Sequence, residues 1–103
     1  MATRATVADT SETRRVGLLK HASLEPGDGL WIVPCEAVHS FWMKFSIDVL
    51  YLNRDKTVRK IRHGMKPWRL SYCLPAHSVL ELPAGTAAGT NTQLGDQLAF
   101  DKI

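Results

Sequence analysis

The sequence predicts a mainly-β fold, a small single-domain β-barrel or β-sandwich of about six short strands with one short N-terminal helix. Three observations predict it. Short apolar runs of strand length recur along the chain, turn residues separate them at intervals of roughly 8–12 residues, and one stretch near the start carries helix-start residues. The 103 residues suffice for one hydrophobic core. We therefore expect one domain over residues 1–103, with residues 1–4 flexible.

The strands are predicted from apolar runs that end at glycine, proline or other turn residues. Residues 47–52 are apolar at every position except Asp48, which indicates a strand covered on both faces. Asn53–Lys56 is a turn, so this strand and the next form a hairpin. The predicted strands are residues 5–8, 30–33, 47–52, 57–63, 78–82 and 97–101.

The helix and the irregular segments follow from local residues. Asp9 can cap a helix that continues to about His21, because Glu12 lies three residues later, as in a capping box. Residues 64–75 are predicted to be irregular, because prolines interrupt them, with Trp68 as their apolar anchor.

Composition and charge exclude several classes of protein. The hydrophobic fraction of 45% and charged fraction of 22% are those of an ordinary globular protein, and the net charge of +3 is mild. No run approaches the ~18 consecutive apolar residues of a membrane span. Residues 1–15 contain no apolar segment of secretory type, so we expect a cytoplasmic protein. No phosphate-binding loop or dinucleotide fingerprint occurs, and no cofactor is expected.

Several motifs in order along the chain resemble one family. They are Arg14-x-x-Gly17-Leu18, His39-Ser-Phe-Trp-Met-Lys44, Ile47-Asp-Val49, Val79-Leu-Glu-Leu-Pro-Ala-Gly85 and Gly95-Asp96. Together they resemble the domain of unknown function 192 family, also called the uncharacterised ACR family, of bacteria and archaea. The resemblance implies a mainly-β domain with a helix near its start, and it implies no activity. Many members of that family carry an export signal or lipoprotein leader, whereas residues 1–15 predict none here.

A repeated cysteine–histidine spacing raises two chemical alternatives. Cys35-x-x-x-His39 recurs as Cys73-x-x-x-His77, and four such residues would make the Cys2His2 set that zinc prefers. The spacing lies outside the commonest zinc patterns, so buried thiols with separately hydrogen-bonded histidines are favoured. Alternatively, Cys35 and His39 would be a nucleophile and its base in a small enzyme.

Two carboxylates lie inside runs that are otherwise apolar. Asp48 and Glu81 must each be paired or hydrogen-bonded if buried, or take up a proton. On neighbouring strands they would face one another, or pair with Arg14 or His39, around one pocket. Two close carboxylates would serve as the general acid and base of a small enzyme or would bind a hard cation. Backbone hydrogen bonds to Asp48 and an ion pair or turn contact for Glu81 would explain the same residues without chemistry.

A basic stretch suggests nucleic acid as a further alternative. Residues 54–69 contain seven lysines and arginines and only Asp55 in opposition, with Trp68 among them. An exposed edge hairpin protected by its charges explains the stretch equally, and no aromatic ladder accompanies the charges.

We therefore expect a small binding or accessory module rather than an enzyme, acting on a small ligand or a protein. Its expected polar site comprises His39, Trp42, Asp48, Glu81 and Arg14.

Overall fold

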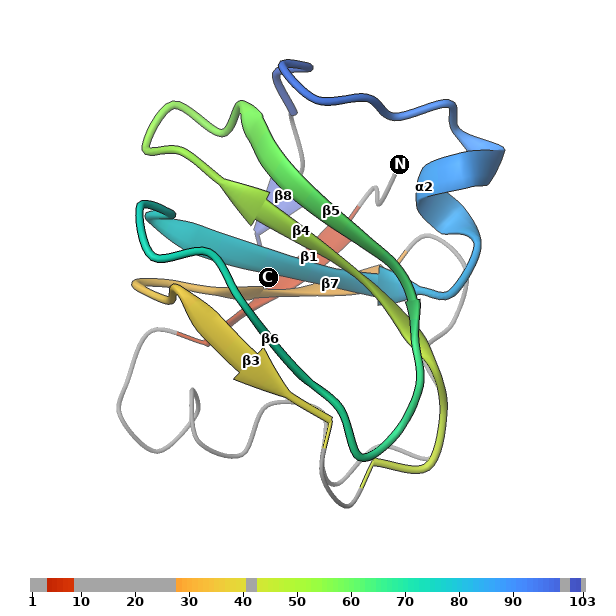
Figure 1. Cartoon of the computed structure of the whole chain (residues 1–103). Coiled ribbons are helices and arrows are strands. Elements are labelled where there is room, and N and C mark those ends of the chain that lie inside the picture. Colours follow the sequence, from red (N-terminus) through yellow and green to blue (C-terminus); the bar gives the residue numbers. More distant parts are fainter. Residues whose placement is uncertain (1–3, 9–27, 41–42, 99–100, 103) are drawn as a thin grey trace.

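The computed structural model describes residues 4–8, 28–40, 43–98 and 101–102, which form two β-sheets and a one-turn helix (Figure 1). The elements are β1 (Arg4–Ala8), β2 (Asp28–Ile32), β3 (Ala37–His39), β4 (Ile47–Leu52), β5 (Val58–Met65), β6 (Leu70–Tyr72), β7 (Ser78–Pro83), α2 (Thr86–Gly89) and β8 (Asp101–Lys102).

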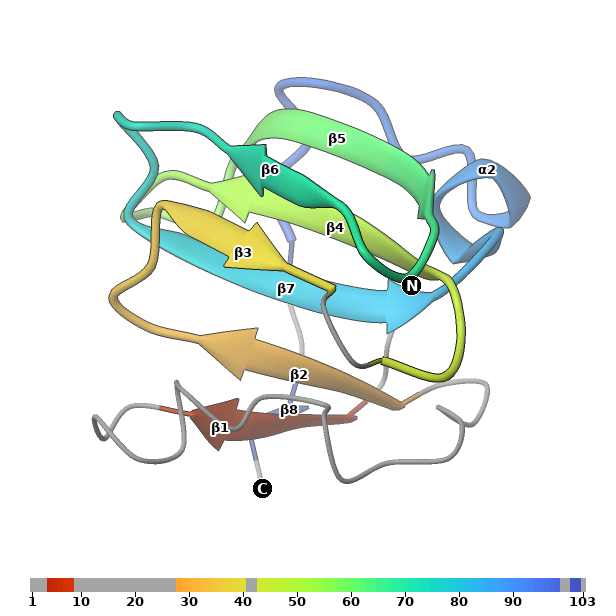
Figure 2. The same ribbon diagram turned by 60° about the horizontal axis from the view of Figure 1, so that its bottom comes forward.

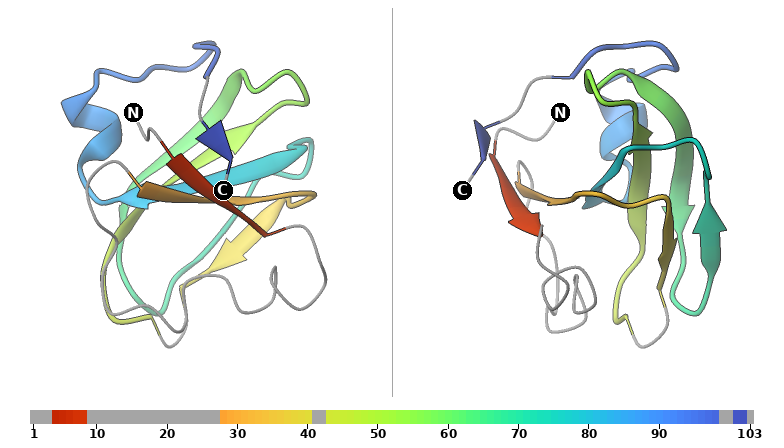
Figure 3. Two further views of the ribbon diagram at one scale, coloured as in Figure 1. Left: turned by 180° about the vertical axis from the view of Figure 1, so that it is seen from behind. Right: turned by 90° about the vertical axis from the view of Figure 1, so that its left-hand side faces the viewer.

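The large sheet has six strands in the order β5-β4-β7-β2-β1-β8. Strands β5, β4, β7 and β2 pair antiparallel, whereas β1 pairs parallel with both β2 and β8. Figure 3 shows β1 and β8 together, at the sheet edge opposite β5. The parallel pairs β1–β2 and β1–β8 need long connections rather than tight turns.

The small sheet pairs β3 with β6 antiparallel, and it lies over one face of the large sheet (Figure 2). We call this the sandwich face and the other the helix face, because α2 packs there. Within the described residues the two sheets are separate and do not close into a barrel. The predicted mainly-β fold is therefore confirmed as two packed layers.

Strict alternation along the central strands divides the core into two clusters, one on each face. All six residues of β4 are buried, as expected of a strand covered on both faces. The sandwich-face cluster is Leu30, Ile32, Val38, Met43, Ile47, Val49, Tyr51, Met65 and Val79. The helix-face cluster is Trp31, Leu50, Leu52, Val58, Leu80, Leu82 and Ala87.

The central strands lie where the sequence predicts them, and one segment differs. Strand β4 coincides with residues 47–52, and the hairpin with β5 is confirmed. Residues 64–75 are not wholly irregular, because they contain the end of β5 and the whole of β6. The predicted helix of residues 9–21 lies outside the described residues. Of the predicted last strand, Gln97 makes an isolated bridge to Thr57.

Asp48 joins three elements on the helix face. Its Oδ1 accepts a hydrogen bond from the Gly64 N–H at 2.8 Å, and its Oδ2 accepts one from the Ala87 N–H at 2.8 Å. Gly64 lies at an irregularity of β5 with φ 55°, where glycine is favoured. The N-cap of α2 is Gly85, which has no side chain for capping, so Asp48 satisfies a first-turn N–H instead.

We predict that Asp48→Ala lowers the free energy of unfolding by about 2–5 kcal/mol, because the part-buried Gly64 N–H and the buried Ala87 N–H both lose a charged acceptor. Urea unfolding measures the loss, and amide exchange should accelerate at Gly64 and Ala87. Asp55→Asn is the matched control, since this exposed turn carboxylate also accepts two hydrogen bonds, both from Thr57. An equal loss in the two variants would contradict the role given to Asp48.

Candidate functional site

The two carboxylates of the expected polar site lie on opposite faces of the large sheet. Strands β4 and β7 are neighbours, and their register pairs Val49 with Glu81 and Asp48 with Leu82. Directly paired residues share a face, so Glu81 lies on the sandwich face and Asp48 on the helix face. The structure therefore does not bring the two carboxylates together around one pocket.

The other residues of the expected polar site are dispersed or lie outside the described residues. His39 is exposed on the outward surface of the small sheet, away from Asp48 on the helix face. Arg14 and Trp42 lie outside the described residues. Asp48 has the backbone partners that an architectural role requires.

Glu81 is buried among apolar neighbours. It is 3% exposed, and Leu30 and Val49 flank it on the adjacent strands. No hydrogen bond from the described residues reaches its carboxyl group, and burial raises its pKa to about 8. Glu81 is therefore largely protonated at neutral pH.

Tyr51 is the second polar group of the sandwich face. Burial raises the pKa of its hydroxyl to about 12, and the nearby Ser71 hydroxyl lowers it in part. The Tyr51 and Ser71 hydroxyls nevertheless do not meet the geometry of a hydrogen bond, and neither has a partner among the residues that the structure describes. The neighbouring Cys35, Cys73 and Glu81 raise the pKa further.

The four cysteine and histidine residues are not assembled as a metal site. The described residues contain no group of three or more cysteine, histidine or acidic side chains that could hold a metal ion. The Cys35 thiol donates to the Ala37 carbonyl at 3.1 Å, and no disulfide joins Cys35 to Cys73.

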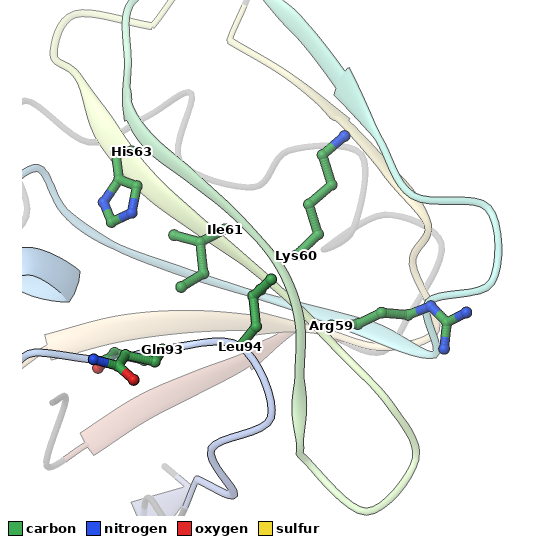
Figure 4. Close-up of a pocket in the computed structure, with 7 residues that line it drawn as sticks. Arg59, Lys60, Ile61, His63, Gln93 and Leu94 are labelled. Carbon is green, nitrogen blue, oxygen red and sulfur yellow. The ribbon is translucent and has the colours of Figure 1, made fainter.

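The basic residues of β5 divide between its two sides. Figure 4 shows Ile61 and His63 pointing toward Gln93 and Leu94, while Lys60 points the other way. The first group lines a shallow cleft of about 460 Å³ between β5 and residues 92–94. Lys60 turns instead toward the small sheet, where its Nζ donates to the Tyr72 carbonyl at 2.6 Å.

Four large apolar side chains are exposed at every second position along β6 and the turns that flank it. Trp68, Leu70, Tyr72 and Leu74 are exposed by 52%, 62%, 59% and 65%. We call these four residues the apolar stripe. Between Leu70 and Tyr72, Ser71 points inward and is only 4% exposed. Strand β6 is thus inside out: its apolar Leu70 and Tyr72 face solvent and its polar Ser71 faces the core, whereas a half-buried strand normally buries its apolar side chains.

A buried serine holds the turn from which the apolar stripe begins. The Ser40 hydroxyl donates to the Lys66 carbonyl at 2.6 Å and accepts from the Arg69 N–H at 2.8 Å. The Ser40 carbonyl accepts from the Trp68 N–H at 2.9 Å. These bonds fix Trp68 at φ 66°, a left-handed conformation that is uncommon for a bulky residue and typical of constrained sites.

The sequence around β6 contains a pattern that predicts a strand there. Residues 68–74 read Trp-Arg-Leu-Ser-Tyr-Cys-Leu, an alternation of period two that is typical of a strand. The alternation alone would have indicated that the apolar side chains face the core, which is the reverse of the structure.

The fold and this surface define a two-layered β domain with an exposed apolar face. The sequence profile of the uncharacterised ACR family, domain of unknown function 192, matches residues 1–100, and the chain belongs to that family. No helix among the described residues is long and apolar enough to cross a membrane.

Similar proteins agree with this assignment. A UPF0127 protein of Pyrococcus abyssi is 31% identical, over 91% of this chain and 83% of that protein. One from Pyrococcus furiosus is 30% identical, over 72% of this chain and 68% of that protein. A crystal structure of a protein of unknown function from Novosphingobium aromaticivorans has a TM-score of 0.83, with 22% identity over 90% of this chain and 71% of that one.

A second solved structure, of a "putative transcription regulator" from Sinorhizobium meliloti, has a TM-score of 0.86. It is 24% identical and covers 92% of this chain and 79% of that one. At this identity the likeness shows the fold.

We predict that Glu81→Gln removes a loss of stability as the pH rises. Because the pKa of Glu81 rises from 4.5 to about 8 on folding, the folded state retains the proton that the unfolded state releases. The wild type should lose on the order of 4 kcal/mol, relative to the variant, between pH 4.5 and pH 8, with no further relative loss above. Urea unfolding across this range measures the difference, and parallel curves for both proteins would contradict a buried, protonated Glu81.

Ser40 and Ser78 offer a matched pair for testing the turn. Both are fully buried, but Ser40 has several hydrogen bonds whereas the Ser78 hydroxyl has none. We predict that Ser40→Ala costs about 1–3 kcal/mol and that Ser78→Ala is close to neutral. Urea unfolding compares them, and nuclear magnetic resonance should show a shifted Trp68 indole only in Ser40→Ala. Equal losses would contradict a special role for Ser40.

Proposed function

We propose that the chain is a small binding module that docks a polypeptide partner on the outward surface of the small sheet. The observation that carries the proposal is the apolar stripe, four large apolar side chains within seven residues that are 52–65% exposed. Single exposed apolar residues are ordinary on proteins, whereas a group of them marks an interaction surface.

The inside-out strand supports this proposal energetically. Burying one leucine or aromatic side chain is worth about 1.5–3 kcal/mol, so β6, which exposes Leu70 and Tyr72, forgoes several kcal/mol of stabilisation. A slip of one residue would reverse the two sides of β6. The observed register instead places a polar Ser71 inside, with its hydroxyl unpaired. A partner that covers the stripe recovers the hydrophobic stabilisation.

The composition of the surface favours a polypeptide partner over other classes. Tryptophan and tyrosine are the residues that most often anchor protein interfaces, and leucines complete an apolar centre. Leu70 separates the two aromatic rings, which leaves no continuous series of rings on which successive bases could stack. On the neighbouring strand, Ala37 and His39 pair with Tyr72 and Leu70 and extend the surface. His39 is the one residue of the expected polar site on it.

We predict that Leu70→Thr with Tyr72→Thr abolishes binding and changes stability by less than about 1 kcal/mol, because both side chains are exposed. The probe is an uncharged peptide in which apolar residues alternate with serine. Nuclear magnetic resonance titration should place the shifts at residues 68–74 in the wild type.

Leu94→Thr is the matched control, because Leu94 is 65% exposed and lies away from the small sheet. It should bind the peptide as the wild type does. Absence of binding to the wild type, or an equal loss in the control, would overturn the proposal. Sedimentation that shows a dimer lost only in the double variant would assign the surface to a second copy of the chain instead.

A further inference from the structure

We infer that the segment bound on the apolar stripe is acidic; this inference rests on the docking function proposed above. It is carried by the charges that border the stripe. Four exposed cations lie along its β5 side and around its first residue, namely Lys60, Arg62, Lys66 and Arg69. An apolar centre with a rim of one charge sign selects partners of the opposite sign.

The position of each cation follows from the contacts between β5 and β6. The Lys60 Nζ reaches the Tyr72 carbonyl at 2.6 Å and lies 5.4 Å from the centre of the Tyr72 ring. The chain turns back at residues 66–69, so β5 and β6 run in opposite directions (Figure 2). This antiparallel run places Arg62 level with Leu70.

The remaining cations stand at the Trp68 end of the stripe. Lys66 and Arg69 belong to the turn that Ser40 holds, on either side of Trp68 in the chain. The Arg69 guanidinium bonds to the carbonyls of Pro67 and Trp68, at 3.3 and 3.4 Å, which keeps its charge at this turn.

Few carboxylates oppose these charges within the described residues. Asp55 lies in the β4–β5 turn at the other end of β5, and Asp96 follows the Leu94 turn. Glu36 is the exposed carboxylate near the stripe, and its carbonyl accepts the Cys73 N–H beside Leu74. The rim is therefore cationic from Tyr72 to Trp68 and acidic at the Leu74 end, which orients the partner.

The spacing of the stripe indicates the form of the segment. Leu70 and Tyr72 lie two residues apart on the extended strand β6, so their side chains project on the same side at a spacing of roughly 6–7 Å. An extended segment with apolar side chains at alternate positions has the same repeat. A second copy of this chain fits less well, because it would bring two surfaces with excess positive charge together.

The test compares three peptides that share their apolar residues and differ at the alternate positions, which are all glutamate, all serine or all lysine. We predict that the glutamate peptide binds the full chain roughly tenfold more tightly than the serine peptide, and the lysine peptide more weakly than either. The advantage of the glutamate peptide should shrink as the salt concentration rises.

Arg62→Gln with Lys66→Gln removes two rim charges and should weaken the glutamate peptide by roughly threefold to tenfold. It should leave the serine peptide unchanged. Arg54→Gln with Arg59→Gln is the control, since it removes the same charge at the other end of the hairpin. It should change neither peptide.

The outcomes separate this inference from the docking proposal. If glutamate and serine peptides bind equally at all salt concentrations, and both are lost in the Leu70→Thr/Tyr72→Thr variant, docking holds and the acidic partner is wrong. If neither peptide binds, both fail. Tighter binding of oligothymidylate or of phosphatidylserine vesicles than of the glutamate peptide would overturn the acidic polypeptide in favour of nucleic acid or a membrane surface.

Discussion

The register between β4 and β7 is the constraint on which the rest of the structure depends. Both strands are buried on both faces, so a slip of one residue would move every side chain to the opposite layer. In the observed register Asp48 meets the amides of Gly64 and Ala87, while Glu81 enters the apolar space beneath the small sheet. This one pairing gives the two similar carboxylates different surroundings.

The sequence predicts the central strands well, because a run such as residues 47–52 is apolar on both sides and is stopped by turn residues. It also indicates that Asp48 and Glu81 are buried. It cannot assign them to faces, since this depends on a pairing between segments about 30 residues apart. The orientation of strand β6 is not predicted for another reason. Local patterns are interpreted by assuming that apolar side chains face the core, whereas Leu70 and Tyr72 of β6 face outward.

The two sheets hold together by different means. The large sheet is stabilised by two apolar clusters and would follow from hydrophobic burial alone. Each strand of the small sheet is three residues long, and Val38 and Ser71 are its residues that face the core. Hydrogen bonds hold the backbone around β6: the Ser40 hydroxyl bonds to the backbone of Lys66 and Arg69, and Lys60 donates to the Tyr72 carbonyl. These bonds explain how a strand with its apolar side outward remains in place.

The hydrogen bonds of Ser40 hold the backbone of residues 66–69 next to the apolar stripe. These bonds run from one hydroxyl and one carbonyl to the backbone, so the conformation of residues 66–69 does not depend on which side chains the stripe carries. If this surface binds the partner proposed above, substitutions at positions 68, 70, 72 and 74 would alter partner choice without altering these hydrogen bonds. The residues proposed to bind the partner would then differ from Ser40, which holds the backbone, so the binding surface could change in evolution while the fold is retained.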